Sequence, residues 1–178
     1  MKSFFHVLLV FVCAAIVLMS CSKKEPSYTI SYCSADNEPV WVEKVKYDNY
    51  PIKEGGGMMG GWKQAMGLIA LFPPPPIPKK IYIYWFNYRQ QVFYEATVPL
   101  QPDAADIMED LEPPEYGRYV LTTGVLPDGS AVVWVSNSLS SADYGSWVEV
   151  GRAKGRLAEG NVQDFHDQTV SLRRRGKI

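Results

Sequence analysis

Few residues in this chain have types and spacings that could support catalysis or metal binding. His166 stands between Asp164 and Asp167, which together could supply a metal site or an acid–base pair. Ligands on one helix face are three or four residues apart and ligands on one strand face are two apart, so this trio fits neither pattern. Cys33 ends the alternating stretch Tyr28-Thr29-Ile30-Ser31-Tyr32-Cys33, which predicts a small buried hydrophobe rather than a nucleophile.

The remaining catalytic patterns are also weak. The glycine run that ends at Gly61 is followed by Trp62, whereas a phosphate-binding loop needs lysine and then serine or threonine. The carboxylate pair Glu109 and Asp110 lies beside a proline-rich helix end and is typical of a solvated face. We therefore expect a protein that is not an enzyme and that uses no cofactor or metal. An envelope hydrolase using His166 and Asp167 is the least favoured alternative.

The N-terminal segment indicates where the protein is located rather than how it folds. Lys2 precedes an apolar run, and Leu18-Met19-Ser20-Cys21 resembles a bacterial lipobox. We expect residues 1–20 to be a cleaved lipoprotein signal peptide, Cys21 to be lipidated and residues 21–27 to form a polar tether. The alternative is an uncleaved membrane helix, but a full span needs roughly 20 apolar residues and this run is shorter. Cys13 is a poorer lipidation site because bulky Val12 precedes it.

The composition limits the possible partners. The chain has 178 residues and a formal net charge of −1, so no overall basic field favours nucleic acid. Ser22, in place of aspartate, resembles the outer-membrane pattern of lipoproteins, and we expect an outer-membrane protein that is lipid-anchored and faces the periplasm. The basic segment at residues 173–177 predicts a solvated, frayed tail, with contact to anionic lipid headgroups as the alternative.

Strand-forming residues dominate the rest of the chain. They predict a mainly β (α+β) domain over residues 28–178, with antiparallel sheets in a β-sandwich-like arrangement and one or two short helices. Asp128-Gly129 between two apolar runs is a strong hairpin signal. We expect strands over residues 40–47, 80–88, 91–98, 119–125, 131–136 and 147–151. The spacing predicts one helix over residues 104–111, capped by Asp103, and a weaker one over residues 156–163.

The segment at residues 55–78 is a Gly/Pro-rich loop of unusual apolarity. Glycines begin it, a run of prolines ends it and apolar residues lie between them. Long apolar connections are often functional or packed against the fold. The first interpretation is a flap over one sheet face. The second is an exposed partner-binding patch, for which the candidate residues are Met58, Met59, Trp62 and Phe72.

Two hairpin motifs suggest a family. The segment Ile81-Tyr82-Ile83-Tyr84-Trp85-Phe86 precedes Val92-Phe93-Tyr94-Glu95-Ala96, and Gly124-Val125-Leu126-Pro127-Asp128-Gly129-Ser130 precedes Ala131-Val132-Val133-Trp134-Val135. In this order after a lipobox, they resemble the hairpins of the DUF2931 lipoprotein family. The resemblance brings no established activity and no catalytic residues.

The resemblance also implies a class of partner. Some similar lipoproteins look like immunity proteins that neutralise secreted antibacterial lipase effectors. We therefore expect a membrane-anchored binding domain with a toxin or effector as a possible protein partner. The alternative is a general structural or assembly lipoprotein of the cell envelope.

Overall fold

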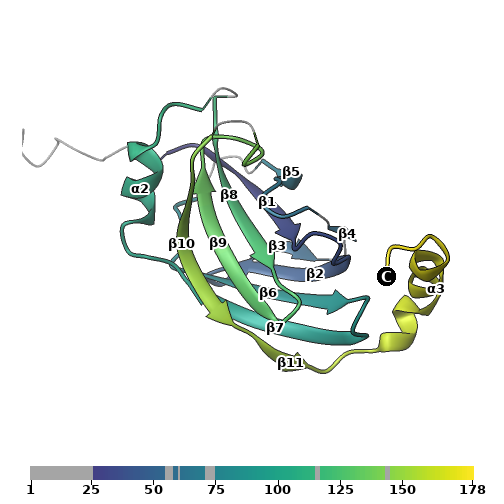
Figure 1. The fold of residues 1–178 in the computed structure, drawn as a ribbon. Coiled ribbons are helices and arrows are strands. Elements are labelled where there is room, and N and C mark those ends of the chain that lie inside the picture. Colours follow the sequence, from purple (N-terminus) through teal and green to yellow (C-terminus); the bar gives the residue numbers. More distant parts are fainter. Residues whose placement is uncertain (1–25, 55–57, 60, 71–74, 115–116, 143–144) are drawn as a thin grey trace, which may run out of the picture.

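Two β-sheets form the molecule (Figure 1). The computed structural model describes residues 26–54, 58–59, 61–70, 75–114, 117–142 and 145–178. Within them, the first sheet has the order β10-β9-β8-β1-β5, and the second has the order β11-β7-β6-β2-β3 with β4 also beside β2. The strands are β1 (Tyr28–Ser34), β2 (Val40–Tyr47), β3 (Tyr50–Glu54), β4 (Met58–Met59), β5 (Met66–Ile69), β6 (Lys80–Asn87), β7 (Val92–Pro99), β8 (Tyr119–Val125), β9 (Ser130–Ser136), β10 (Trp147–Lys154) and β11 (Arg156–Ala158).

The mainly β prediction is confirmed. All the strand pairings in the described residues are antiparallel except that of β1 with β8, which is parallel. The six strands predicted with ranges correspond to β2, β6, β7, β8, β9 and β10, and the Asp128-Gly129 turn joins β8 to β9. The sequence therefore located the central hairpins of both sheets.

A β-bulge in β2 explains why its buried and exposed residues do not alternate strictly. The pairing of β2 with β6 shifts between Val42 and Lys44, so Val42 and Val45 both face the core although they are three residues apart. This bulge leaves Lys44 and Lys46 on the outer face of the sheet, where both are exposed.

The main core lies between the two sheets and includes Ile30, Val42, Ile83, Leu121 and Val133. A second apolar cluster covers part of the outer face of the second sheet, and a third lies on the outer face of the first sheet. Phe86 on β6 and Trp134 on β9 are therefore buried although they face outward.

The helices differ in part from the prediction. Helix α2 (Ala104–Asp110) confirms the helix expected at residues 104–111, but the Asp103 side chain makes no capping hydrogen bond. The helix expected over residues 156–163 is wrong: Arg156–Ala158 is β11, which pairs with β7. The 3-10 turn η1 (Val162–Phe165) and helix α3 (His166–Arg174) follow it.

The C-terminal basic segment is not a frayed tail. Arg173 and Arg174 belong to α3, and Gly176 follows with a φ of 65°. The amides of Gly176 and Lys177 donate to the carbonyls of Arg173 and Leu172, which is the hydrogen-bond pattern of a Schellman C-cap. The backbone of this segment is therefore part of the folded domain.

The loop at residues 55–78 contains two short strands that the sequence did not predict. Strand β4 pairs with β2, and β5 pairs with β1 at the edge of the first sheet. Residues 1–20 and Cys21 lie outside the described residues. In the described part of the chain, no helix has the length and apolarity needed to cross a membrane.

Candidate functional site

Of the four predicted partner-binding side chains, the structure describes that of Trp62. The Trp62 ring is half-buried and meets Trp134 edge-on, with ring centroids 4.8 Å apart. The Trp62 amide donates to Asp36, and the neighbouring Ala65 amide donates to the Leu139 carbonyl. Trp62 therefore covers the outer face of the first sheet, as the flap interpretation expects.

The other three candidates give less information. Met58 and Met59 form β4, so their backbone pairs with β2. Phe72 lies outside the described residues. Among the described residues of this region, the large apolar side chains that face solvent include Met66 and Leu68 on β5, which are 44% and 48% exposed.

The residues considered as a nucleophile or as metal ligands do not form a reactive site within the described residues. Cys33 is fully buried, and burial raises the pKa of its thiol to about 11, which disfavours the nucleophilic thiolate. Asp164, His166 and Asp167 are all exposed at the start of the C-terminal helix region, where Asp164 accepts a hydrogen bond from Asn161. Across the described residues, no three His, Cys, Asp or Glu side chains gather as metal ligands would.

A different surface gathers charged and aromatic side chains from four strands. Register places Lys44 opposite Tyr84 and Lys46 opposite Tyr82, while Glu95 stands opposite both Tyr84 and Arg156. Core-facing neighbours alternate with Lys44, Lys46, Tyr82, Tyr84 and Glu95, which therefore lie on the outer face of the second sheet. Arg156 joins them there because its Nε bonds Glu95. We call this surface the tyrosine–lysine face and define it by Lys44, Lys46, Tyr82, Tyr84, Glu95 and Arg156.

The two lysines lie over the tyrosine rings. Lys44 Nζ is 5.6 Å from the centroid of the Tyr84 ring, and Lys46 Nζ is 5.8 Å from that of Tyr82. These are cation–π distances. Neither lysine forms an ion pair with a described carboxylate. Their ammonium groups are therefore free to meet an acidic group while the rings supply apolar area beneath them.

Glu95 organises the other half of this face. Its carboxylate accepts from the Tyr82 hydroxyl at 2.8 Å and from Arg156 Nε at 2.8 Å. The hydrogen bond from Tyr82 and that from Arg156 lower the pKa of Glu95, and burial followed by the Glu95 bond raises the pKa of Tyr82 to about 12. At neutral pH, Glu95 is thus a charged acceptor and Tyr82 a neutral donor, so neither is poised for proton transfer.

A cleft of about 260 Å³ opens beside Glu95. It is lined by Tyr82, Glu95, Ala96, Thr97, Lys154 and Arg156. Its lining combines an aromatic ring with hydrogen-bonding and charged groups, which is the composition of a site that binds a polar ligand group.

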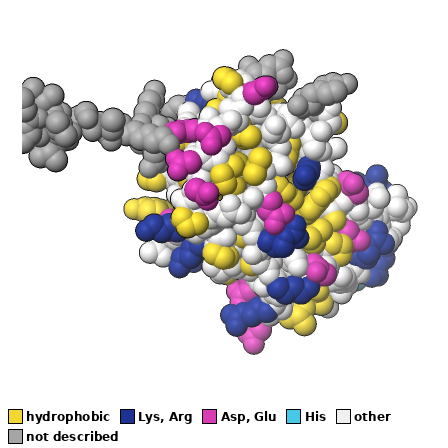
Figure 2. Space-filling model, turned by 60° about the vertical axis from the view of Figure 1, so that its left-hand side comes forward, with side chains coloured by type: hydrophobic (Ala, Val, Ile, Leu, Met, Phe, Trp, Pro, Cys, Tyr) yellow, Lys and Arg dark blue, Asp and Glu magenta, His cyan; other side chains and the backbone are white. Residues whose placement is uncertain are grey.

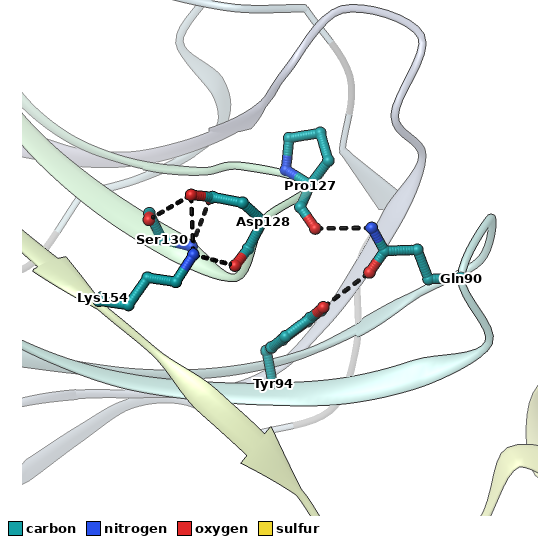
Figure 3. Close-up of polar contacts among 6 residues, drawn as sticks. All are labelled: Gln90, Tyr94, Pro127, Asp128, Ser130 and Lys154. Carbon is teal, nitrogen blue, oxygen red and sulfur yellow. Dashed lines mark hydrogen bonds and ion pairs between the residues drawn. The ribbon is translucent and has the colours of Figure 1, made fainter.

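An ion pair and hydrogen bonds around the β8–β9 turn connect the two sheets and hold one wall of this cleft (Figure 3). Lys154 Nζ binds the Asp128 carboxylate at 2.8 Å, and the same carboxylate accepts from the Ser130 amide and hydroxyl. From the other sheet, Gln90 donates to the Pro127 carbonyl and accepts from the Tyr94 hydroxyl, each at 2.7 Å. Lys154 is therefore fixed by the β8–β9 turn rather than free to swing over the cleft.

Sequence reasoning missed the tyrosine–lysine face although part of its signal is visible. Lys44 and Lys46, and likewise Tyr82 and Tyr84, have the two-residue spacing that puts side chains on one face of a strand. The sequence does not say that β2 lies beside β6, nor that Arg156 reaches Glu95 across the β7–β11 pair.

The described residues thus define a two-sheet β-sandwich with a charged, aromatic outer face. Comparison with family models shows which group of proteins this is: the model described as "Protein of unknown function (DUF2931)" matches residues 18–176. The chain belongs to this family, as the two hairpin motifs suggested. Comparisons with curated proteins and with solved structures gave no match.

Proposed function

We propose that this protein is a non-catalytic binding protein of the bacterial envelope that docks a macromolecular partner on the tyrosine–lysine face. The observation that carries the proposal is the pairing of Lys44 and Lys46 with the rings of Tyr84 and Tyr82. Tyrosine rings are enriched at protein interfaces, where they supply contact area. The two unpaired ammonium groups add a positive charge that steers and orients an acidic partner.

The proposed location rests on the N-terminal sequence. Lipidation of Cys21 would hold the domain at the outer membrane, facing the periplasm. The family match begins at residue 18 and so includes Cys21. Several acyl chains at one cysteine would give stable anchoring, whereas a single chain binds a membrane only reversibly.

The sharper form of the proposal is an immunity role, in which the partner is a secreted antibacterial lipase effector. A toxin-neutralising protein must cover its target without turnover, which suits Glu95 and Tyr82 in fixed protonation states. The alternative is a general envelope component that helps assembly. It predicts that binding does not depend on a neighbouring effector gene.

The test is recovery of the partner from native cells that carry the neighbouring secretion genes. The full chain, solubilised in neutral detergent, would be compared with Lys44→Glu, Lys46→Glu and the control Lys79→Glu. All three lysines are exposed, so each substitution changes the same charge with little effect on packing.

We expect the two substitutions on the face to reduce recovery of one stoichiometric partner by at least about tenfold, since reversing a charge replaces attraction with repulsion. The Lys79 control should recover that partner as the unchanged protein does. Equal recovery by all variants would reject the tyrosine–lysine face. A partner that is an envelope component rather than an effector would favour the assembly role.

A further inference from the structure

We propose that the C-terminal end of α3 is a second docking surface, which fits an acidic protein surface. This basic end is defined by Arg173, Arg174, Arg175 and Lys177. It is separate from the tyrosine–lysine face and needs no property of that face to operate.

The first observation is that the four cations are exposed and unpaired. All are solvent-exposed, and no described carboxylate lies within ion-pair distance of them. Four other cations of the described residues are paired: Arg89 with Glu38, Arg152 with Glu149, Lys154 with Asp128 and Arg156 with Glu95. The basic end therefore retains charge that an external acidic group could neutralise.

The second observation is that the basic end is held rigidly. Leu172 and Ile178 pack in the apolar cluster under α3, and the Tyr88 hydroxyl bonds the Gln168 side chain. Arg89 reaches from the β6–β7 turn to the Lys177 carbonyl at 3.4 Å. Docking side chains on an ordered backbone lowers the entropy lost on binding, which favours a specific partner.

The third observation is the charge difference between the two ends of the molecule. Helices α2 and α3 lie at opposite ends (Figure 1). The start of β1 lies near the end of α2, because Tyr119 bonds both segments: its amide donates to the Ser27 carbonyl and its hydroxyl to the Leu111 carbonyl. Residues 103–112 contain five acidic and no basic side chains, and acidic groups gather at this end in Figure 2. A domain tethered through its N-terminus would present the basic end away from the tether.

The geometry of α3 favours a protein over a flat membrane. Successive helical residues are about 100° apart, so the side chains of Arg173 and Arg174 fan out around the helix end instead of lying in one plane. Arg175 Nε is drawn back to the Ser171 carbonyl at 3.3 Å. Such a convex knob fits an acidic groove, where guanidinium groups bind carboxylates with two hydrogen bonds each.

Helix stabilisation is a weaker explanation for the whole set. Cations near a helix C-terminus do interact favourably with its dipole, and Arg173 and Arg174 lie in the last turn. Lys177, however, lies beyond the C-cap, where the backbone has already turned away. The helix C-terminus carries only about half an elementary negative charge, so the dipole accounts for part of this set of four cations.

The experiment measures binding of a fluorescent poly-L-glutamate peptide to the full chain in a neutral polyoxyethylene detergent. Arg173→Gln/Arg174→Gln is compared with Lys79→Gln/Lys80→Gln, which removes two exposed, adjacent cations. Lys79 lines a cavity together with Ala104 and Ala105 of α2, so this pair lies away from α3. Arg174→Gln alone serves as a second variant, and urea unfolding checks that each protein is folded. A short DNA duplex is the competing probe.

We expect the double arginine variant to bind the peptide about 2- to 30-fold more weakly, because each exposed ion pair contributes about 0.2–1 kcal/mol. The lysine control should bind as the unchanged protein does. Absence of peptide binding by the unchanged protein, or equal weakening by both variants, would overturn the proposal. Binding of the duplex in place of the peptide would also overturn it, because the ligand would then be a phosphate polymer.

Discussion

Replacing Gly129 by alanine should destabilise the domain more than its backbone angle alone predicts. Gly129 has a φ of 81°, and an added Cβ would stand 2.6 Å from two carbons of the Tyr94 ring. The ring cannot move aside freely. It stacks on Trp85 with centroids 5.5 Å apart, and its hydroxyl bonds Gln90 at 2.7 Å.

A matched control variant divides the loss of unfolding free energy in Gly129→Ala into two parts. A left-handed conformation costs a residue with a Cβ about 1–2 kcal/mol. Forcing an extra carbon into a packed site costs about 1–3 kcal/mol more. Gly117 has a φ of 71°, but its Cβ would meet nothing within 4 Å. Gly117→Ala should therefore show the first cost only, and Gly129→Ala about 2–5 kcal/mol in total.

The assay is urea unfolding followed by tryptophan fluorescence, with the free energy of unfolding compared at equal slope. A third variant, Tyr94→Phe, removes the hydroxyl that holds the ring to Gln90. Gly129→Ala should be milder in this background because the ring can then shift. The reasoning is refuted if Gly129→Ala is no more destabilising than Gly117→Ala.

Three further predictions concern other parts of the fold. Lys154 and the Ser130 amide lower the pKa of Asp128 to about 2, so its stabilisation is present above about pH 4 and lost as the pH falls towards 2. Because both partners are largely exposed, we expect only about 1 kcal/mol, which Asp128→Asn should abolish in acid titrations of stability. Phe165→Ala should cost about 3–5 kcal/mol in urea unfolding, because this ring stacks on Phe86 at 4.4 Å. The Cys33 thiol should react with a thiol reagent only on unfolding, since it is buried; rapid labelling of the native protein would contradict this.

The central strands could be predicted because their signals are local. Strands β8 and β9 are joined by Asp128-Gly129, and Gly129 supplies the positive φ that this turn requires. The β-branched and aromatic run at residues 80–88 predicts a strand from its own residue types, and the structure places β6 there. These features need no knowledge of distant partners.

Elements that depend on distant partners were missed. The edge strand β5 pairs with β1, with Ile69 opposite Ile30, and nothing in its own sequence separates it from the surrounding loop. The segment Arg156–Ala158 has residues that suit a helix, but pairing with β7 makes it a strand. The tyrosine–lysine face was missed for the same reason, because it joins side chains from strands that only the sheet order brings together.

Several motif residues that identify the family serve the architecture. A Cβ on Gly124 would stand 2.5 Å from the Trp134 ring, so this glycine lets the tryptophan lie flat across the sheet. Asp128 orders the turn, and Gly129 admits the Tyr94 ring against it. The recognisable hairpins thus close the sandwich, and the first of them also supplies Tyr82, Tyr84 and Glu95 to the tyrosine–lysine face. The docking lysines and arginines lie outside the motifs. Family membership therefore accounts for this fold, and function has to be sought on the two charged surfaces.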